Sequence, residues 1–285
     1  MDAPTEHGIV LTDTPDAVLR PMAVAALTLV FALAGRLLVK DRLVREDRWA
    51  ERTAHRGLGL TTRTLGVVGA GGIGRELLGL ARPFFGRRVA ADPYADTGAV
   101  RALGAELLGL DELLPEADFV VVSCPLNEDT FHLFDAARLR RMRPSAYLID
   151  IARGPVVDEA ALVAALQANA IAGAGLDVFE GEPIRPGTLL ARMDDVVLTP
   201  HALGWTDECF HGIAATGFRG IVAFGPGPAP GFRGQPDRPR PGAGHRRARP
   251  GRTDARRGLA HRGTRRHPRA AWRKERRWAT ASGWG

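Results

Sequence analysis

An α/β fold built on a doubly wound parallel sheet is predicted by three features of the sequence. From Thr64 onward, short apolar runs alternate with helical patterns. The first apolar run, 65–68, leads directly into Gly69-Ala70-Gly71-Gly72-Ile73-Gly74, a G-x-G-x-x-G. A second apolar run, 89–91, ends on Asp92. Strand, glycine turn, helix, strand and acid in this order predict a Rossmann-type sheet that binds a dinucleotide.

The glycine turn has the composition that a pyrophosphate site requires. Gly69 permits the tight turn after the strand, and Gly71 lets backbone N–H groups approach a phosphate. Gly74 lets the following helix pack closely on the sheet. That helix would begin at Ile73, where unpaired N–H donors and the positive end of the helix dipole favour an anion. We therefore expect this turn to hold the cofactor.

The acid after the second strand bears on which cofactor is bound. Asp92 lies 18 residues beyond Gly74, where its carboxylate could accept both hydroxyls of an adenine ribose. A 2′-phosphate would be repelled there, so the position predicts NAD. The alternative is that Asp92 caps a helix starting near Pro93.

Six strands joined by short helices are expected between residues 64 and 198. The predicted strands are 64–69, 88–92, 119–123, 146–151, 172–176 and 196–198, and the predicted helices are 73–82, 97–103, 110–116, 133–142 and 158–168. A strand-like segment at 8–12 and one long helix from Pro21 to about Trp49 come before the sheet. A last amphipathic helix is expected over 206–224.

Charge is distributed unevenly along the chain. The whole sequence has 39 Lys+Arg and 32 Asp+Glu, whereas residues 226–285 alone carry 17 basic and 3 acidic residues. The remainder is therefore mildly acidic. The basic tail, 225–285, is rich in Arg, Pro and Gly and is predicted to be disordered. Two explanations stay open, out-of-frame translation of GC-rich sequence and a basic arm for nucleic acid, and the lack of a recognisable nucleic-acid module favours the first.

Cysteine usage and hydropathy predict a cytoplasmic protein. Two cysteines, Cys124 and Cys209, cannot build a disulfide framework, which fits a reducing compartment. The first twenty residues lack the basic start of a secretory signal. The longest apolar stretch, Met22–Gly35, has 14 residues, which is too short to span a bilayer. We expect it to be a buried or interface helix, with no membrane partner.

Polar residues follow the later strands, at the edge where open α/β sheets bind ligands. Arg153 could hold a carboxylate through two parallel hydrogen bonds and orient the adjacent carbonyl. His201 could give a proton to a forming alkoxide, and Glu182 would orient that imidazole and favour its protonated form. Asp177 could accept a hydrogen bond from a nicotinamide amide. Taken singly, each has another explanation as a turn or solvated residue, and Cys124 is more simply a small core residue.

Together these motifs resemble the D-isomer-specific 2-hydroxyacid dehydrogenases, over about residues 5–224. The matching pieces are GAGGIG at 69–74, DPY at 92–94, CPLNEDT at 124–130, ARG at 152–154, LDVFEGEP at 176–183 and TPHALGWT at 199–206. The resemblance implies hydride transfer between NAD and a D-2-hydroxy acid/2-oxo acid pair, catalysed by Arg153, Glu182 and His201 without a metal. The implied cofactor contacts are Gly69, Gly71, Gly72, Ile73, Gly74, Asp92, Cys124, Pro125, Thr130, Ile151, Ala152, Arg153, Asp177, His201 and Gly204.

The resemblance also implies a domain plan and a partner. Residues 1–20 would be a remnant of a substrate domain, 21–205 the NAD-binding domain, 206–224 a return helix and 225–285 an unrelated tail. Helix 21–49 resembles the helix that contributes to a homodimer in this family. The small 2-oxo or 2-hydroxy acid substrate would be the other partner.

Departures from the family pattern leave a second function open. Family members begin with about a hundred more residues, which form most of the substrate domain, so the sequence is expected to be N-terminally truncated. They also usually carry a histidine near Ser123 and a threonine near Asn127. A non-catalytic NAD-binding sensor or corepressor on the same fold is therefore the alternative. Glu182 favours the hydroxyacid reaction over that of a formate-oxidising relative, where glutamine usually stands.

Overall fold

The computed structural model describes residues 13–223, and the account of the fold is limited to them. The strand-like segment at 8–12, the last residue of the helix expected over 206–224 and the whole basic tail lie outside the described residues. The predictions made for those segments therefore stay predictions.

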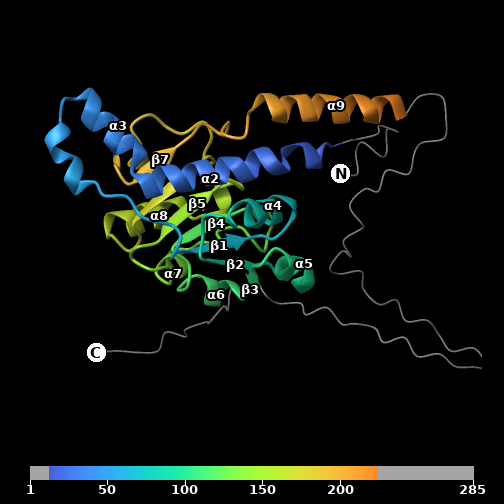
Figure 1. The fold of residues 1–285 in the computed structure, drawn as a ribbon, viewed down its shortest axis with the longest axis horizontal. Coiled ribbons are helices and arrows are strands. Elements are labelled where there is room, and N and C mark those ends of the chain that lie inside the picture. Colours follow the sequence, from blue (N-terminus) through green and yellow to red (C-terminus); the bar gives the residue numbers. More distant parts are fainter. Residues whose placement is uncertain (1–12, 224–285) are drawn as a thin grey trace, which may run out of the picture.

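One parallel sheet forms the centre of the molecule (Figure 1). Its strands are arranged in the order β3-β2-β1-β4-β5-β6-β7, and every neighbouring pair is parallel. The strands are β1 (Thr64–Val68), β2 (Arg87–Ala91), β3 (Glu106–Leu107), β4 (Phe119–Val122), β5 (Tyr147–Asp150), β6 (Gly173–Leu176) and β7 (Val196–Leu198). The order reverses between β1 and β4, which is the doubly wound arrangement, and the predicted Rossmann-type fold is confirmed.

The sheet has one strand more than the sequence predicted. Strand β3 extends the edge beyond β2 by pairing Glu106 with Val89 and Leu107 with Ala90. It is two residues long, and Glu106 is exposed. An apolar run was the signal used to predict strands, and such a short segment with a polar residue does not supply one.

Helices cover both faces of the sheet. Those in the described residues are α2 (Leu19–Gly35), α3 (Leu37–Arg45), α4 (Gly72–Leu80), α5 (Thr97–Ala102), α6 (Leu110–Leu113), α7 (Ala136–Leu139), α8 (Glu159–Gln167) and α9 (Asp207–Ala223). One core cluster joins α2, α4 and α5 to the sheet, and the other joins α6, α7 and α8 to its opposite face. Neighbouring strand residues alternate between the clusters, as Val67 and Val68 do.

The prediction of one continuous helix over 21–49 is wrong. Helix α2 ends at Gly35 and α3 begins at Leu37, because Arg36 adopts a left-handed conformation with φ of 51°. A 3₁₀ segment, Trp49–Ala54, follows α3. The expected helix 133–142 is likewise reduced to α7, whose first N–H groups are capped by the Asp135 carboxylate.

Helix α2 lies directly on the sheet, although its length and composition would also suit a membrane helix. Among the described residues, the helical run Pro15–Gly35 is long and apolar enough to cross a bilayer, so the 14-residue count underestimated it. However, α2 packs on β6 so closely that a Cβ at Gly175 would lie 3.1 Å from Leu29 Cβ. Its residues Ala23, Ala26 and Val30 are fully buried. We interpret α2 as a core helix, which agrees with the expected buried helix.

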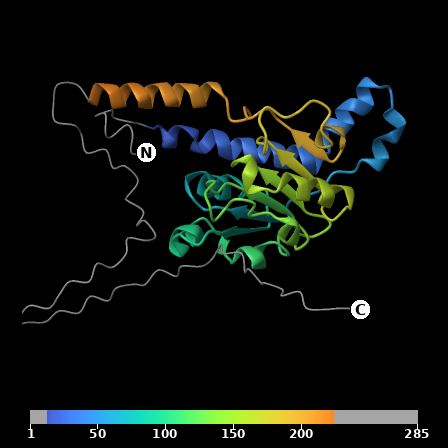
Figure 2. The ribbon, with the colours of Figure 1, turned by 180° about the vertical axis from the view of Figure 1, so that it is seen from behind.

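The outermost helix, α9, follows the strand-end loop after β7 (Figure 2). It contacts the 3₁₀ turn η1 (Pro15–Val18) at the start of α2, where a Cβ at Gly212 would lie 3.2 Å from Ala17 Cβ. The first turn and the last helix of the described chain are therefore in contact, and the loop carrying His201 lies between β7 and this contact.

Candidate active site

The glycine turn connects β1 to α4 at the carboxyl edge of the sheet. Gly69 has φ of 96°, and a Cβ there would lie 2.7 Å from Cys124 N. A Cβ at Gly74 would lie 2.0 Å from Gly69 O, so the turn closes only with glycine at both positions. Gly71, by contrast, is the exposed N-cap of α4, and nothing lies within 4 Å of where its Cβ would be. The open side of Gly71 leaves room for a phosphate beside the first N–H groups of α4.

Asp92 lies directly after β2 and beside that turn. Its Oδ2 accepts a hydrogen bond from Ala70 N at 2.9 Å, and its Oδ1 accepts one from Tyr94 N at 2.8 Å. The next helix, α5, begins at Thr97 and is capped by Asp96 instead. The helix-cap alternative for Asp92 is therefore wrong, and the carboxylate stays at the mouth of the glycine turn, where the ribose of a dinucleotide would lie.

The loop after β4 holds the predicted contacts Cys124, Pro125 and Thr130. Burial, with the charges of Asp150 and Asp92, raises the pKa of the Cys124 thiol to about 12. That thiol is a core group and not a nucleophile. Thr130 is buried, donates to Pro125 O at 2.6 Å and accepts from Asn127 N at 2.8 Å. The structure thus uses the Thr130 hydroxyl to close the loop.

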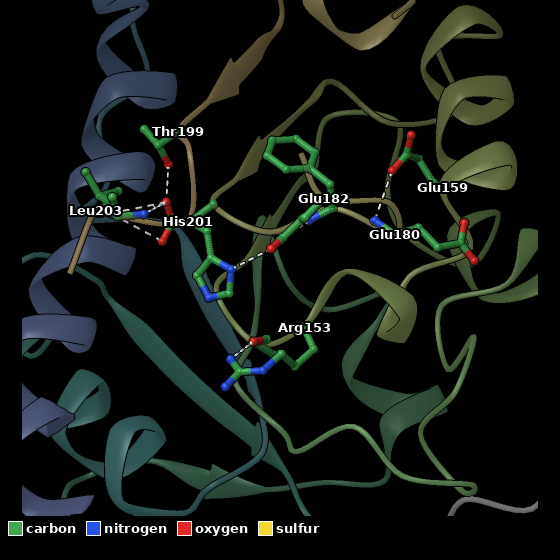
Figure 3. Close-up of polar contacts among 11 residues, drawn as sticks. Arg153, Glu159, Glu180, Glu182, Thr199, His201 and Leu203 are labelled. Atoms are coloured by element: carbon green, nitrogen blue, oxygen red, sulfur yellow. Dashed lines mark hydrogen bonds and ion pairs between the residues drawn. The ribbon is translucent and has the colours of Figure 1, made fainter. Parts of the chain in front are cut away.

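The end of β5 leads into Arg153 through two buried residues. Ile151 and Ala152 have buried side chains, which belong to the two core clusters on opposite faces of the sheet. Arg153 is exposed, and its Nη1 donates to Ala152 O at 2.6 Å. Figure 3 shows its guanidinium lying beside the pair formed by Glu182 and His201.

Glu182 and His201 are in direct contact. His201 Nδ1 lies 2.8 Å from Glu182 Oε2, and Glu182 Oε1 accepts Phe179 N at 3.0 Å (Figure 3). Burial acts to raise the pKa of Glu182, but the hydrogen bonds from His201 and Phe179 and the charges of His201 and Arg153 outweigh it and leave that pKa below its ordinary value. The carboxylate is therefore ionised near neutral pH. It fixes the ring so that Nε2 is the nitrogen left for a proton transfer.

The backbone of His201 is held in a left-handed conformation by Asp177. His201 has φ of 54°, and its N–H donates to Thr199 O at 3.0 Å. Asp177 Oδ1 accepts from Thr199 Oγ1 at 2.7 Å, and also from Ala202 N and Leu203 N. The buried carboxylate predicted to receive the nicotinamide amide thus also shapes the loop that presents His201.

Gly204, the last predicted cofactor contact, faces helix α2. It is buried, and a Cβ there would lie 2.3 Å from Met22 Sδ. The structure brings Arg153, Glu182 and His201 together, and it places Gly204 against the neighbouring helix.

Sequence reasoning missed a buried acid beneath the site. Asp150 ends β5, is 1% exposed and accepts Ala152 N at 2.8 Å. Burial raises the pKa of Asp150 well above its usual value, more than the hydrogen bond from Ala152 and the charge of Arg153 lower it. An acid that ends an apolar strand two residues before Ala152 was the available signal. Its hydrogen bond shapes the turn that leads to Arg153.

This edge of the sheet is suited to hydride transfer with a dinucleotide. The sheet order, the glycine turn and the open N-terminus of α4 provide a place for a pyrophosphate, and a histidine–carboxylate pair for proton transfer lies at the same edge. Fold and site therefore define a dinucleotide-dependent dehydrogenase. The family model described as D-isomer specific 2-hydroxyacid dehydrogenase, NAD binding domain, matches residues 27–202. The chain belongs to this family.

Known relatives agree with that assignment. A glyoxylate reductase from Thermococcus onnurineus is 41% identical over 233 residues, which is 79% of this chain and 69% of the relative. Among solved structures, a D-lactate dehydrogenase from Aquifex aeolicus complexed with NAD and lactic acid has a TM-score of 0.71 and 28% identity, covering 78% of this chain and 71% of its own. A glyoxylate reductase from Paecilomyes thermophila has a TM-score of 0.71 and 31% identity, and the match covers 78% of this chain and 67% of the reductase.

The predicted family, reaction class and cofactor are thereby confirmed. The chain is an NAD-dependent oxidoreductase of the D-2-hydroxy acid/2-oxo acid class. The relatives named here are enzymes, and they give no support to the sensor or corepressor alternative.

Proposed function

We propose that this chain reduces a small 2-oxo acid with NADH, using Arg153, Glu182 and His201 as its catalytic residues. The observation that carries the proposal is the 2.8 Å contact between His201 Nδ1 and Glu182 Oε2, beside the Arg153 guanidinium at the carboxyl edge of the sheet. Bound NADH supplies the hydride. The remaining chemistry belongs to these three side chains.

Each side chain has a distinct task in this proposal. Arg153 binds the substrate carboxylate and so directs the neighbouring carbonyl carbon toward the cofactor. His201 donates the proton on Nε2 to the carbonyl oxygen as it becomes an alkoxide, and takes it back in the oxidation. Glu182 holds the ring through Nδ1 and stabilises the imidazolium. Asp92, the glycine turn and the other predicted contacts would hold NAD.

The proposed substrate is an acid of the size of glyoxylate. Two similar proteins are named glyoxylate reductases, and one of them is 41% identical to this chain. We infer a preference for glyoxylate over larger 2-oxo acids such as pyruvate. Residues 21–205, which include the matched segment 27–202, would form the NAD-binding domain.

The test is NADH oxidation by the purified full chain, followed at 340 nm with glyoxylate and with pyruvate. We expect His201→Gln to lower kcat by about 10²-fold to 10⁴-fold, since a general acid contributes that much. Arg153→Lys should raise the KM for the 2-oxo acid, because lysine cannot form the paired hydrogen bonds. Glu128→Gln, an exposed acid on the loop after β4, is the matched control for Glu182→Gln.

Two results would contradict the proposal. NADH binding, measured by fluorescence, without turnover of either acid would favour the sensor alternative. Full activity in Glu182→Gln and His201→Gln would remove these residues from the catalytic set.

We also propose that α2 and α3 contribute to a homodimer in the cytoplasm. Phe31, Leu37, Leu38 and Val44 are large apolar residues of these helices that stay exposed in the single chain. Burial of such an apolar surface between two subunits stabilises permanent dimers. Val44→Glu should convert the dimer to a monomer in light scattering, and a wild-type protein that is monomeric at micromolar concentration would refute this.

The cytoplasmic location is proposed from the two cysteines. Both are buried and unpaired, which fits a reducing compartment.

A further inference from the structure

The loop after β6 carries Glu182, and its shape depends on the Phe179–Glu180 peptide. Phe179 N, which belongs to the preceding Val178–Phe179 peptide, donates to Glu182 Oε1 at 3.0 Å, so the position of the Phe179 backbone bears directly on the carboxylate that holds His201. The Phe179–Glu180 peptide lies on Gly154, where a Cβ would be 1.9 Å from the Phe179 carbonyl. On its other side, Glu180 N donates to Glu159 Oε2 at 3.2 Å.

The side chain of Glu180 is held by His132, a residue of a different loop. His132 Nε2 contacts Glu180 Oε1, and His132 Nδ1 lies 3.8 Å from Asp158 Oδ2. The imidazole stacks on Phe131, with ring centroids 4.0 Å apart and an interplanar angle of 16°. Its side chain is 24% exposed, which makes it less accessible than that of His201 at 44%.

The backbone at His132 is built to aim this ring. His132 has φ of 48°, and its N–H donates to Pro155 O at 2.8 Å. Two further hydrogen bonds, Phe134 N to Val156 O and Asp158 N to Phe134 O, join the loop after β4 to the segment after β5. The turn closed by Thr130 comes immediately before. The imidazole is thus supported by two strand-end loops while it holds a third.

We propose that His132 is a positioning residue for the reaction, which through Glu180 fixes the Phe179 backbone, whose N–H orients Glu182 toward His201. The inference rests on the proposed function, because it assigns no contact between His132 and substrate or cofactor. The chain of contacts runs from the loop after β4, across Glu180, to the catalytic pair. Without His132, the side chain of Glu180 loses a partner and the backbone from Phe179 to Glu180 is held less firmly. Phe179 N then no longer fixes the Glu182 carboxylate as well in its orientation toward His201.

The test compares His132→Ala with His132→Gln in the full chain. A glutamine can place an N–H donor near Glu180 Oε1, so it is the conservative variant, and His211→Ala on the exposed surface of α9 is the matched control. With glyoxylate and NADH, His132→Ala should lower kcat about ten-fold and leave the KM for NADH unchanged, because a small misplacement of a catalytic group reduces the rate and not cofactor binding. His132→Gln should recover most of that loss.

A second readout needs no turnover. Long-range ¹⁵N–¹H NMR correlations of His201, assigned with His201→Gln, report which ring nitrogen carries the proton in the neutral ring. Glu182 favours the proton on Nδ1, so Glu182→Gln should move it toward Nε2. We expect His132→Ala to move the His201 tautomer in the same direction, and His132→Gln and His211→Ala to leave it as in the wild type.

The possible outcomes separate the two proposals. If Glu182→Gln changes neither kcat nor the His201 tautomer, the proposed function fails. If Glu182→Gln has both effects and His132→Ala has neither, the positioning role is overturned. A fall in thermal stability of His132→Ala with an unchanged tautomer and unchanged kcat would show a purely structural role and also overturn it.

Discussion

Gly154 offers a direct test of how closely the catalytic loops must fit. It follows Arg153, and the Phe179–Glu180 peptide lies against it on the path to Glu182. A Cβ at Gly154 would lie 1.9 Å from both the carbon and the oxygen of the Phe179 carbonyl and 2.4 Å from Glu180 N. All three are backbone atoms, so no flexible side chain can move aside. Gly154→Ala therefore has to push two strand-end loops apart.

The size of the effect follows from that distance. Ordinary contact begins near 3.4 Å, so the loops must separate by about 1.5 Å. A displacement of about 1 Å at a catalytic group can cost about 10²-fold in rate, and overpacking costs about 1–3 kcal/mol of stability. We expect Gly154→Ala to lower kcat for 2-oxo acid reduction by about 10²-fold and to destabilise the protein by about 2 kcal/mol.

The assay pairs Gly154→Ala with Gly181→Ala. Gly181 lies in the same loop between Glu180 and Glu182, and nothing lies within 4 Å of where its Cβ would be. Steady-state rates with NADH and urea unfolding should therefore show Gly181→Ala close to the wild type, within about 0.5 kcal/mol. Wild-type rate and stability in Gly154→Ala, or equal damage in both variants, would refute the reasoning.

Three further predictions concern single groups. The raised pKa of buried Asp150 means that the folded protein keeps a proton that the unfolded chain releases, so unfolding free energy should fall by up to about 1.4 kcal/mol per pH unit above about pH 4. In Asp150→Asn this slope should disappear, and urea titrations at pH 5 and 7.5 that give the same wild-type minus variant difference would contradict it. Cys124, with its pKa near 12, should resist a thiol reagent at pH 8 until the protein unfolds, and rapid labelling of the folded protein at Cys124 would be the opposing result. Asp92→Ala should raise the KM for NADH more than that for NADPH, because the acid disfavours a 2′-phosphate, and equal changes would argue against its role.

The sequence predicted the fold well where one signal determined the structure. The glycines at 69 and 74 can be replaced by no other residue without a clash with backbone, so their spacing predicts the turn from the sequence alone. The apolar runs of β1, β4 and β5 are buried on both faces, and such runs identify central strands. The contact between Glu182 and His201 followed from placing both residues at the ends of neighbouring strands.

The failures came from structure that depends on contacts distant in the sequence. The break at Arg36 lies within a continuous helical pattern, next to the point where Leu58 N, from the segment after α3, donates to Ala34 O at 2.8 Å. Strand β3 exists because β2 offers an edge to pair with. His132 owes its role to Glu180, which lies 48 residues further along the chain, and no local pattern shows this contact. Asp150 owes its raised pKa to burial by the surrounding fold, which its place at the end of an apolar strand only hints at.

The left-handed backbone of His201 makes part of the site sensitive to residues outside the catalytic set. A histidine at φ of 54° is strained relative to an extended residue, and the Asp177 and Thr199 hydrogen bonds hold it there. Loss of either partner would let the loop relax and turn the imidazole away while every catalytic atom remained present. In a collection of inactive variants, Asp177 and Thr199 should therefore recur among proteins that still fold.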